Sequence, residues 1–253
     1  MFGICNLANI PLRFEPSDRS ELVSQILFGE HFQIIEQNTK WSKIKLAFDN
    51  YEGWIDNKQF KTLDAEQFDA LNHSDLLFNG DLIEYVTSTD NLLIPIPLGA
   101  SLSFLSIPTI NTENYHFEGL KVTGQKQKTE IINTAFMYLH SPYLWGGRTP
   151  FGIDCSGFTQ MVYKLNGYKL LRDASQQANQ GDPLSFIEES EPGDLAFFDN
   201  EEGTIIHVGI IMENNYIIHA SGKVRIDRLD HLGIYNAELN KHTHKLRVIK
   251  KII

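Results

Sequence analysis

The chain has 253 residues, of which 42% are hydrophobic and 21% are charged, and its formal net charge is −10. This composition is typical of a soluble globular protein, and the length allows one large domain or two to three small ones. The negative charge argues against nucleic acid and against an anionic membrane surface as the main partner. No stretch approaches the roughly 18 consecutive apolar residues that a membrane-spanning helix needs.

The N-terminal stretch MFGICNLANIPLRFEPSDRS lacks the basic start, the long apolar segment and the small-residue cleavage site of a secretory signal. If Met1 is the native start, we expect the protein in the cytoplasm. Cys5 and Cys155 are the only cysteines, which is too few for a disulfide framework, so both are expected to be free thiols. Cys5 lies in an apolar, strand-like segment and is expected to be a small core residue.

Short segments rich in β-branched and aromatic residues dominate the first half of the chain. The segments FQIIEQ, WSKIKLA and YEGWID are examples, and the polar stretches NTK and FDN separate them. Short strands at close spacing predict small β-barrels or sandwiches. We therefore expect a small β domain over residues 1–60, a helical or irregular linker over 61–78, and a second β unit of the same kind over 79–123.

The pattern changes near residue 124, where helical spacing replaces the short strands. Apolar residues in QKTEIINTAFMYLHS recur at helical spacing and end before a proline. A second helix is predicted to begin at Cys155, because apolar residues recur at i, i+4 and i+7 from Phe158. The segments DLAFFD, IIHVGIIM, NYIIHAS and KLRVIKKII follow as predicted strands. Helices followed by an antiparallel sheet predict an α+β domain over residues 124–253.

Cys155 lies at the start of its predicted helix, where unpaired N–H groups and the helix dipole favour the thiolate. A buried structural thiol is the alternative interpretation of this position alone. A nucleophilic thiol needs a base, and His207 and His219 lie in two strands that the polar turn ENN joins. If residues 213–215 form the whole connection, Gly209 faces His219, and the two histidines lie diagonally on one face. A connection one residue shorter would place the rings on opposite faces.

One cysteine and two histidines also suit a zinc site, but the chain lacks a close ligand pair such as C-x-x-C or H-x-x-x-H. A nucleophile, a base and a third group that orients the base form an arrangement that recurs on unrelated folds. We therefore favour a catalytic triad over a metal site, with no metal or organic cofactor required.

Four blocks within residues 125–253 resemble the NlpC/p60 family of cell-wall cysteine peptidases. The blocks are YLWGG…DCSGF, PGDLAFF, HVGIIM and YIIHASG, in the order and at the spacing of the family. The resemblance implies a papain-like α+β core with a Cys–His–His triad. It makes Cys155 the nucleophile, His207 the base and His219 the residue that orients the base.

Residues 1–60 resemble a bacterial SH3 (SH3b) domain through PLRFEPSDRSELVSQILFGEHFQIIEQ and YEGWI. Two small SH3b-type barrels before such a catalytic domain are similar to one branch of the family, the γ-D-glutamyl-L-diamino acid endopeptidases or dipeptidyl-peptidases VI. The resemblance implies cleavage between γ-D-Glu and the diamino acid of murein peptides with a free N-terminal L-Ala, in cytoplasmic recycling of the cell wall. We expect a monomer whose partner is the peptide L-Ala-γ-D-Glu-diamino acid.

The same resemblance implies which residues hold the free amine of the substrate. They are Asp154, Ser156 and Tyr143, together with Tyr51, Glu21 and Ser175. An ammonium group taken out of water needs an anionic partner and several acceptors, and Asp154 is that anion. A helix N-cap is its alternative role. We also expect the first SH3b domain to pack against the active-site cleft.

Three other functions remain open at this stage. A wall-peptide-binding module with a degenerate catalytic half is disfavoured, because all three triad residues are present. An amidase or acyltransferase on the same core would not require a free amine, and an exported hydrolase would act on intact wall. The choice between diaminopimelate and lysine stays open. Seven histidines show no constellation and are expected to be surface or structural residues: His31, His73, His116, His140, His231, His242 and His244.

Overall fold

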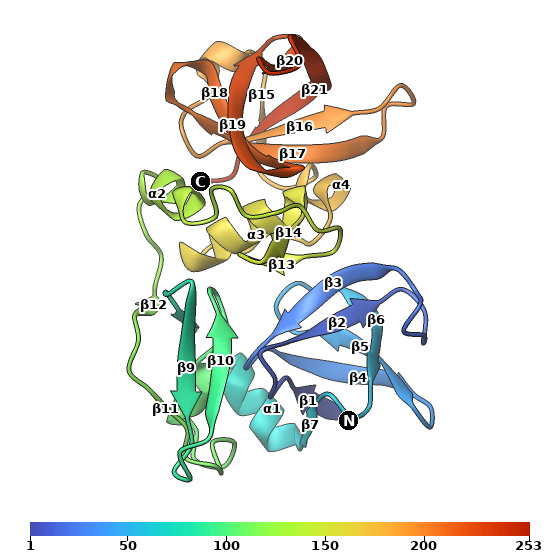
Figure 1. Cartoon of the computed structure of the whole chain (residues 1–253), viewed down its shortest axis with the longest axis vertical. Coiled ribbons are helices and arrows are strands. Elements are labelled where there is room, and N and C mark those ends of the chain that lie inside the picture. The colour runs from blue at the N-terminus through green and yellow to red at the C-terminus, as the bar shows by residue number, and fades with distance from the viewer. The chain divides into compact units, whose positions relative to one another are not determined.

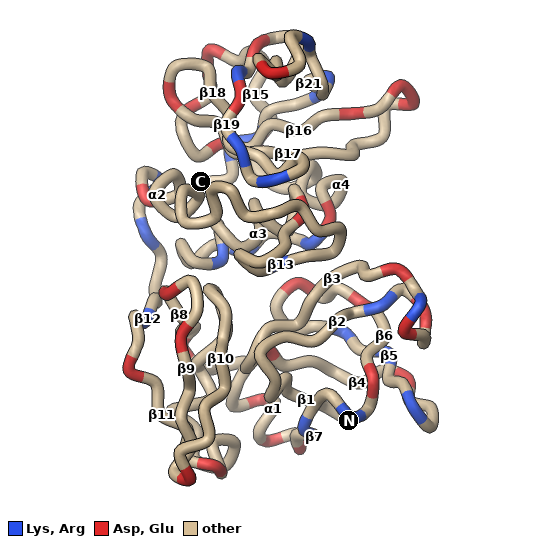
Figure 2. Tube along the Cα trace, in the orientation of Figure 1, with Lys and Arg blue, Asp and Glu red and all other residues tan.

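The computed structural model describes residues 1–253, and the chain divides into two compact units. Unit 1 contains residues 1–124 and 145–150, and unit 2 contains residues 125–144 and 151–253. Figure 1 labels the helices and strands of both units. Figure 2 shows acidic and basic residues interspersed along each unit. None of the helices is long and apolar enough to span a membrane.

An antiparallel sheet of seven strands forms the first part of unit 1, in the order β3-β2-β6-β5-β4-β1-β7. Its strands are β1 (Phe2–Ile4), β2 (Asn9–Arg13), β3 (Leu22–Leu27), β4 (His31–Gln37), β5 (Trp41–Leu46), β6 (Glu52–Asp56) and β7 (Lys61–Leu63). Buried and partly exposed residues alternate along β5, as expected for a strand with one face on the core. The strands predicted from FQIIEQ, WSKIKLA and YEGWID are confirmed as β4, β5 and β6.

The segment 61–78, expected as a linker, is packed into unit 1. It contains β7, which pairs with β1, and helix α1 (Ala65–Asn72), which begins with a capping box at Asp64. Phe68 of this helix stacks on Phe2, with ring centroids 4.1 Å apart. Leu71 is buried in a hydrophobic core of unit 1. The segment is therefore structural, because its apolar residues are needed to complete the core.

The strands that follow form two small sheets of unit 1. Strands β8 (Leu77–Asn79) and β12 (Lys121–Thr123) pair with each other, and β9 (Ile83–Thr87) pairs with β10 (Leu93–Pro97) and β11 (His116–Phe117). A short 3₁₀ helix, η1 (Ser103–Ser106), lies between β10 and β11.

These sheets share one hydrophobic cluster with the first part of unit 1, in which Val86 and Phe104 lie with Ile4 and Phe28. A second SH3b barrel is not confirmed. Two prolines in β10, at positions 95 and 97, limit the ladder that this segment can build, because proline has no N–H to donate.

Residues 145–150 belong to unit 1, although the sequence assigned them to the catalytic domain. Arg148, in the short strand β13 (Arg148–Thr149), is fully buried and forms two hydrogen bonds of 2.9 and 3.0 Å to the carboxylate of Glu30. The guanidinium also donates to the backbone oxygen of Gln25 at 2.7 Å. Trp145 donates from its indole nitrogen to Glu21 at 2.6 Å. A buried ion pair thus anchors this segment.

Unit 2 combines three helices with a sheet of seven strands in the order β15-β21-β16-β17-β18-β19-β20. The helices are α2 (Glu130–Phe136), α3 (Cys155–Leu165) and α4 (Ala174–Gln177), with 3₁₀ turns at η2 (Ile187–Glu189) and η3 (Glu213–Asn215). The strands of this sheet are β15 (Asp182–Leu184), β16 (Leu195–Asp199), β17 (Ile205–Met212), β18 (Tyr216–Ser221), β19 (Lys223–Asp230), β20 (Gly233–Asn236) and β21 (Lys241–Lys251). The short strand β14 (Gly152–Ile153) lies outside this sheet.

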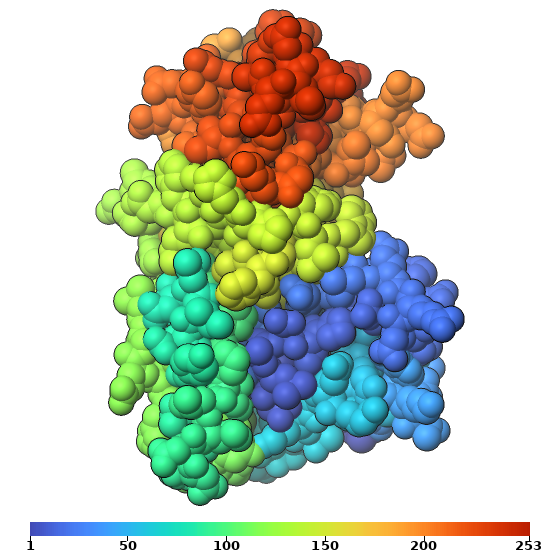
Figure 3. Space-filling view, viewed as in Figure 1, coloured from blue at the N-terminus to red at the C-terminus, as the bar shows by residue number.

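Strand β20 also pairs with β21, which closes the sheet into a barrel. Helix α3 is buried along its whole length and packs against β17 and α2. In the space-filling view the strands β16–β21, orange to red, form a continuous close-packed body (Figure 3). The predicted helix at Cys155 and the four predicted strands of this half are confirmed. Helix α3, which begins at Cys155, thus packs against the sheet at β17.

Candidate active site

Cys155 is the first residue of α3 and is 6% exposed. The preceding Asp154 caps the helix, because its carboxylate accepts from the backbone N–H of Gly157 at 2.6 Å. Burial raises the pKa of the Cys155 thiol to about 12, and the nearby charge of Asp154 acts in the same direction. The expectation that the helix start favours the thiolate is outweighed by desolvation. Burial therefore favours the thiol form of this side chain over the thiolate.

His207 and His219 lie side by side on the β17–β18 hairpin. Residues 213–215 form the connection as η3, and Gly209 pairs with His219 in the predicted register. The Nε2 atom of His207 lies 2.8 Å from Nδ1 of His219. A Cβ at position 209 would lie 2.9 Å from Cβ of His219, so glycine there leaves room for the ring. The predicted pairing of the two histidines is confirmed.

Asp227, which the sequence reasoning missed, continues this row of side chains. It lies on β19, and its Oδ2 is 3.0 Å from Nε2 of His219. Arg225 holds the same carboxylate from Nε at 2.7 Å and from Nη2 at 3.0 Å. The sequence could have indicated Asp227. A hairpin that turns at Gly222 pairs His219 with Arg225 and makes Asp227 a diagonal neighbour of His219.

His244, expected to be a surface or structural residue without a constellation, stacks on His207. The two ring centroids are 4.1 Å apart at an interplanar angle of 25°. His244 also meets His219 edge to face at 5.7 Å, and Phe198 approaches His207 at 5.8 Å. Burial lowers the pKa of His244 to about 4. Burial and the neighbouring His219 and His244 lower the pKa of His207 well below its ordinary value. The rings are neutral at pH 7.

If His207 is the base that the sequence predicts, replacing His244 by alanine is expected to move the acid limb of kcat/KM to higher pH. Without the stacked ring, water reaches His207, and the pKa of His207 rises because burial no longer depresses it fully. A base acts only while it is unprotonated, so activity is lost at a higher pH than in the parent protein. His244→Phe keeps a stacked ring and should retain the parental limb. A pH profile that is unchanged in His244→Ala would contradict this expectation.

Asp154 forms an ion pair with Arg172, a residue that the sequence reasoning did not single out. Nη2 of Arg172 lies 2.5 Å from Oδ2 of Asp154, and Nη1 lies 3.0 Å from Oδ1. Nη1 also donates to the hydroxyl of Ser156 at 3.1 Å. Arg172 is fully buried, so an unpaired guanidinium would be costly there. Asp154 therefore caps the helix and also forms an ion pair. Arg172 holds the Asp154 carboxylate beside Ser156.

The structure brings Tyr143 into the neighbourhood of the cysteine. Burial raises the pKa of Tyr143, and the charges of Cys155 and Asp154 raise it further. The backbone N–H of Tyr143 donates to Gly222 at 3.0 Å, which ties this residue to the turn between β18 and β19. Tyr143, Asp154 and Ser156 thus lie near Cys155 in unit 2, and the backbone N–H of Val208, the residue after His207, reaches the Cys155 sulfur.

The remaining predicted binding residues lie on other elements. Ser175 is an exposed residue of α4 in unit 2. Tyr51 precedes β6 in unit 1, where its backbone N–H donates to Asp49 at 2.9 Å. Glu21 precedes β3 in unit 1 and accepts from Trp145. The binding roles of these three residues stay predictions.

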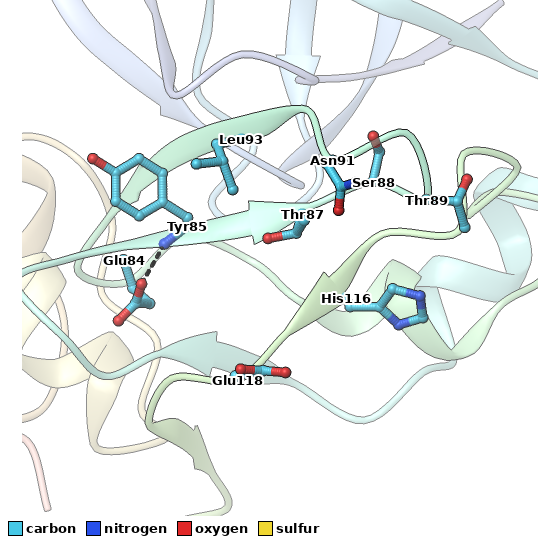
Figure 4. Close-up of a pocket in the computed structure, with 9 residues that line it drawn as sticks. All are labelled: Glu84, Tyr85, Thr87, Ser88, Thr89, Asn91, Leu93, His116 and Glu118. Carbon is cyan, nitrogen blue, oxygen red and sulfur yellow. Dashed lines mark hydrogen bonds between the residues drawn. The ribbon is translucent and has the colours of Figure 1, made fainter.

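A separate hollow of about 660 Å³ lies on the β10-β9-β11 sheet of unit 1 (Figure 4). Its lining carries the carboxylates of Glu84 and Glu118 together with His116, and no cysteine. In Figure 4 the Glu84 carboxylate turns back to the backbone N–H of Tyr85, which donates to it at 2.8 Å.

Two family models match the chain. Residues 140–245 match the NlpC/P60 family, and residues 12–60 match the bacterial dipeptidyl-peptidase SH3 domain. The first match includes Cys155, His207 and His219. The second covers most of the seven-stranded sheet of unit 1, and residues 79–123 lie outside both matches.

Known proteins resemble the chain over most of its length. The γ-D-glutamyl-L-lysine dipeptidyl-peptidase of Bacillus subtilis strain 168 is 30% identical over 222 residues, which cover 78% of this chain and 71% of that protein. Dipeptidyl-peptidase 6 of Lysinibacillus sphaericus is 29% identical over 257 residues, 90% of each chain. The crystal structure of an NlpC/P60 family protein from Bacillus cereus matches the fold with a TM-score of 0.83 at 19% identity, covering 100% of this chain and 99% of that one.

Proposed function

The chain belongs to the NlpC/P60 family of cysteine peptidases, and we propose that it hydrolyses the bond between γ-D-glutamate and the diamino acid of murein peptides with a free N-terminal L-alanine. The observation that carries this proposal is the buried pair His207–His219, hydrogen-bonded at 2.8 Å in the unit that holds the helix-start Cys155. Relatives named as dipeptidyl-peptidases support the substrate class. Recycling of wall peptides in the cytoplasm is part of the proposal.

In the proposed reaction His207 removes the proton of the Cys155 thiol as the sulfur attacks the γ-carbonyl carbon of D-glutamate. Burial raises the pKa of this thiol, so a base is needed to take its proton. The oxyanion accepts from the backbone N–H of Cys155. The imidazolium of His207 protonates the departing amine, and a thioester remains on Cys155. Water, deprotonated by His207, then hydrolyses the thioester and restores the thiol.

The amine end of the substrate is proposed to bind beside Asp154. Arg172 fixes the Asp154 carboxylate, and the hydroxyls of Ser156 and Tyr143 supply further acceptors for an ammonium group. Because Arg172 already balances the charge of Asp154, we expect the hydroxyls to carry much of the recognition.

We also propose that Glu21, Tyr51 and Ser175 take part in binding this amine. Support for Glu21 comes from its hydrogen bond with Trp145, which follows Tyr143 by two positions in the chain. Single substitutions of the three residues would measure how much each contributes to binding the amine.

Hydrolysis of L-Ala-γ-D-Glu-diaminopimelate, of its lysine counterpart and of the N-acetylated form of each tests the proposal. We expect cleavage of the free-amine peptides and a loss of at least about 100-fold in kcat/KM on acetylation, because the cation and its hydrogen bonds are removed. Equal cleavage of free and acetylated peptides would refute the amine requirement. No cleavage of any of them would refute the proposed substrate.

A further inference from the structure

Three buried side chains on neighbouring strands form a hydrogen-bonded row that ends in a carboxylate. Asp227, His219 and His207 are 7%, 1% and 5% exposed, and the two contacts between them measure 3.0 and 2.8 Å. We infer that Asp227 is a positioning residue for the reaction, because it fixes both histidines in one tautomer and leaves Nδ1 of His207 as the base. The role of His207 as the base rests on the proposed function. The tautomers of His207 and His219 are independent of it.

The position of the first proton follows from the charge of Asp227. Burial opposes the charged form, but hydrogen bonds from His219 and Arg225 outweigh it and lower the pKa of this carboxyl. An ionised carboxylate only accepts hydrogen bonds, so Nε2 of His219 must carry the hydrogen of the 3.0 Å contact. Burial also lowers the pKa of His219, so the ring is neutral and its Nδ1 has a lone pair and no hydrogen.

The second proton is then determined by the contact between the two rings. A separation of 2.8 Å between ring nitrogens requires one hydrogen, and Nδ1 of His219 has none to give. Nε2 of His207 is therefore the donor. Because the pKa of His207 lies well below its ordinary value, this ring holds a single proton, and its Nδ1 is unprotonated. Val208, the next residue, places its backbone N–H against the sulfur of Cys155.

Arg225 keeps the carboxylate in the orientation that this assignment needs. It binds both oxygens of Asp227, and its Nη1 also donates to Glu238 at 3.1 Å. The guanidinium charge lowers the pKa of His219, which opposes a second proton on that ring. When His207 becomes an imidazolium during the reaction, its positive charge is stabilised through His219 by the negative charge of Asp227.

The ionisable side chains that face the two rings come from several elements, so a pH profile must be interpreted with all of them. Besides the two rings, they are Arg225 and Asp227 of β19 and His244 of β21. Among them only the carboxylate of Asp227 raises the pKa of His219. Removal of the Asp227 carboxylate should therefore shift the pH profile to lower pH, opposite to the shift expected for His244→Ala.

Nitrogen-15 NMR of the histidine rings in the substrate-free protein at pH 7 tests the tautomers directly. We expect His207 and His219 each to carry hydrogen on Nε2 and none on Nδ1. In Asp227→Asn, the amide can donate as well as accept, so the signals should shift towards a mixture of tautomers. Hydrogen on Nδ1 of His219 in the parent protein, or unchanged tautomers in Asp227→Asn, would overturn the inference. This test involves no substrate, so it stands apart from the proposed function.

Kinetics with the free-amine peptide test the positioning role. Asp227→Asn is expected to lower kcat by about 10²- to 10⁴-fold with little change in KM, as when the carboxylate of a catalytic triad is replaced. The acid limb of kcat/KM should move to lower pH, because the carboxylate that stabilises the His207 imidazolium through His219 is gone. A folded Asp227→Asn variant with the parental kcat, or with a lower kcat and an unmoved limb, would refute the role.

Asp230→Asn is the matched control for this substitution. Asp230 lies on the same strand and accepts from Nε2 of His242 at 2.9 Å, so it forms the same kind of pair outside the site. Its substitution should leave kcat and the pH profile at parental values. An equal loss in Asp227→Asn and Asp230→Asn would show that both act through stability, and would overturn the inference. If the parent protein cleaves no peptide, the proposed function fails while the NMR result keeps its meaning.

Discussion

Replacing Cys155 by alanine is expected to lower kcat by about 10⁴-fold or more, since removal of a catalytic nucleophile has effects of that size in hydrolases of this type. The substitution removes one buried sulfur and leaves the cap at Asp154, so the fold should be retained. Initial rates with the free-amine peptide measure the loss, and circular dichroism checks the fold. A variant that keeps a tenth of the parental kcat would exclude Cys155 as the nucleophile.

Cys5→Ala is the matched control. Cys5 is also buried, and burial raises the pKa of its thiol to about 12 as well. Its sulfur donates to the backbone oxygens of Leu7 and Ile26, far along the chain from any histidine of the site. The two thiols share burial and pKa, but only Cys155 begins a helix and lies beside Asp154. Cys5→Ala should keep the parental kcat, and a loss like that of Cys155→Ala would point to a general effect of thiol removal.

Replacing Arg148 by methionine is expected to lower the free energy of unfolding by about 3–5 kcal/mol, the usual effect of removing one partner of a buried ion pair. Arg148 is fully buried and Glu30 is 5% exposed, so the substitution leaves a carboxylate without its counter-charge. It also removes the hydrogen bond that Arg148 donates to the backbone of Gln25. Urea unfolding monitored by tryptophan fluorescence measures the change.

Two comparisons make this expectation specific. The double variant Arg148→Met/Glu30→Leu should recover much of the loss, because no buried charge is left unpaired. Lys43→Met breaks the exposed pair between Lys43 and Glu52 and should cost no more than about 1 kcal/mol. If Arg148→Met costs as little as Lys43→Met, the buried pair does not stabilise unit 1.

The parts of the site that the sequence predicted depend on short-range rules. The helix at Cys155 follows from apolar spacing, and the register that joins His207 to His219 follows from strand alternation and a short turn. These rules act within about a dozen residues, where the chain leaves few choices. The match of residues 140–245 to the NlpC/P60 family agrees with the motifs around these same positions.

The parts that the sequence did not predict depend on long-range register and on burial. His244 reaches His207 from β21, and the pairing of β21 shifts register against both β16 and β20. Each shift exchanges the faces of the strand, so alternation in the sequence does not tell which face His244 takes. The Cys155 thiol is a second case, because its surroundings and not its place at a helix start decide its pKa. Arg172, which contacts Asp154 from a segment without regular structure, is a third.

The passage of the chain through unit 1 at residues 145–150 has a consequence for any attempt to divide the protein. A fragment that begins at residue 125 keeps Tyr143 and Cys155 but loses Glu30 and Gln25, which hold Arg148. The stretch between Tyr143 and Cys155 would then be free to take other conformations. Residues 145–150 lie between two segments of unit 2 in the sequence but fold as part of unit 1. The activity of such a fragment would therefore depend on a rearranged loop as well as on the catalytic side chains.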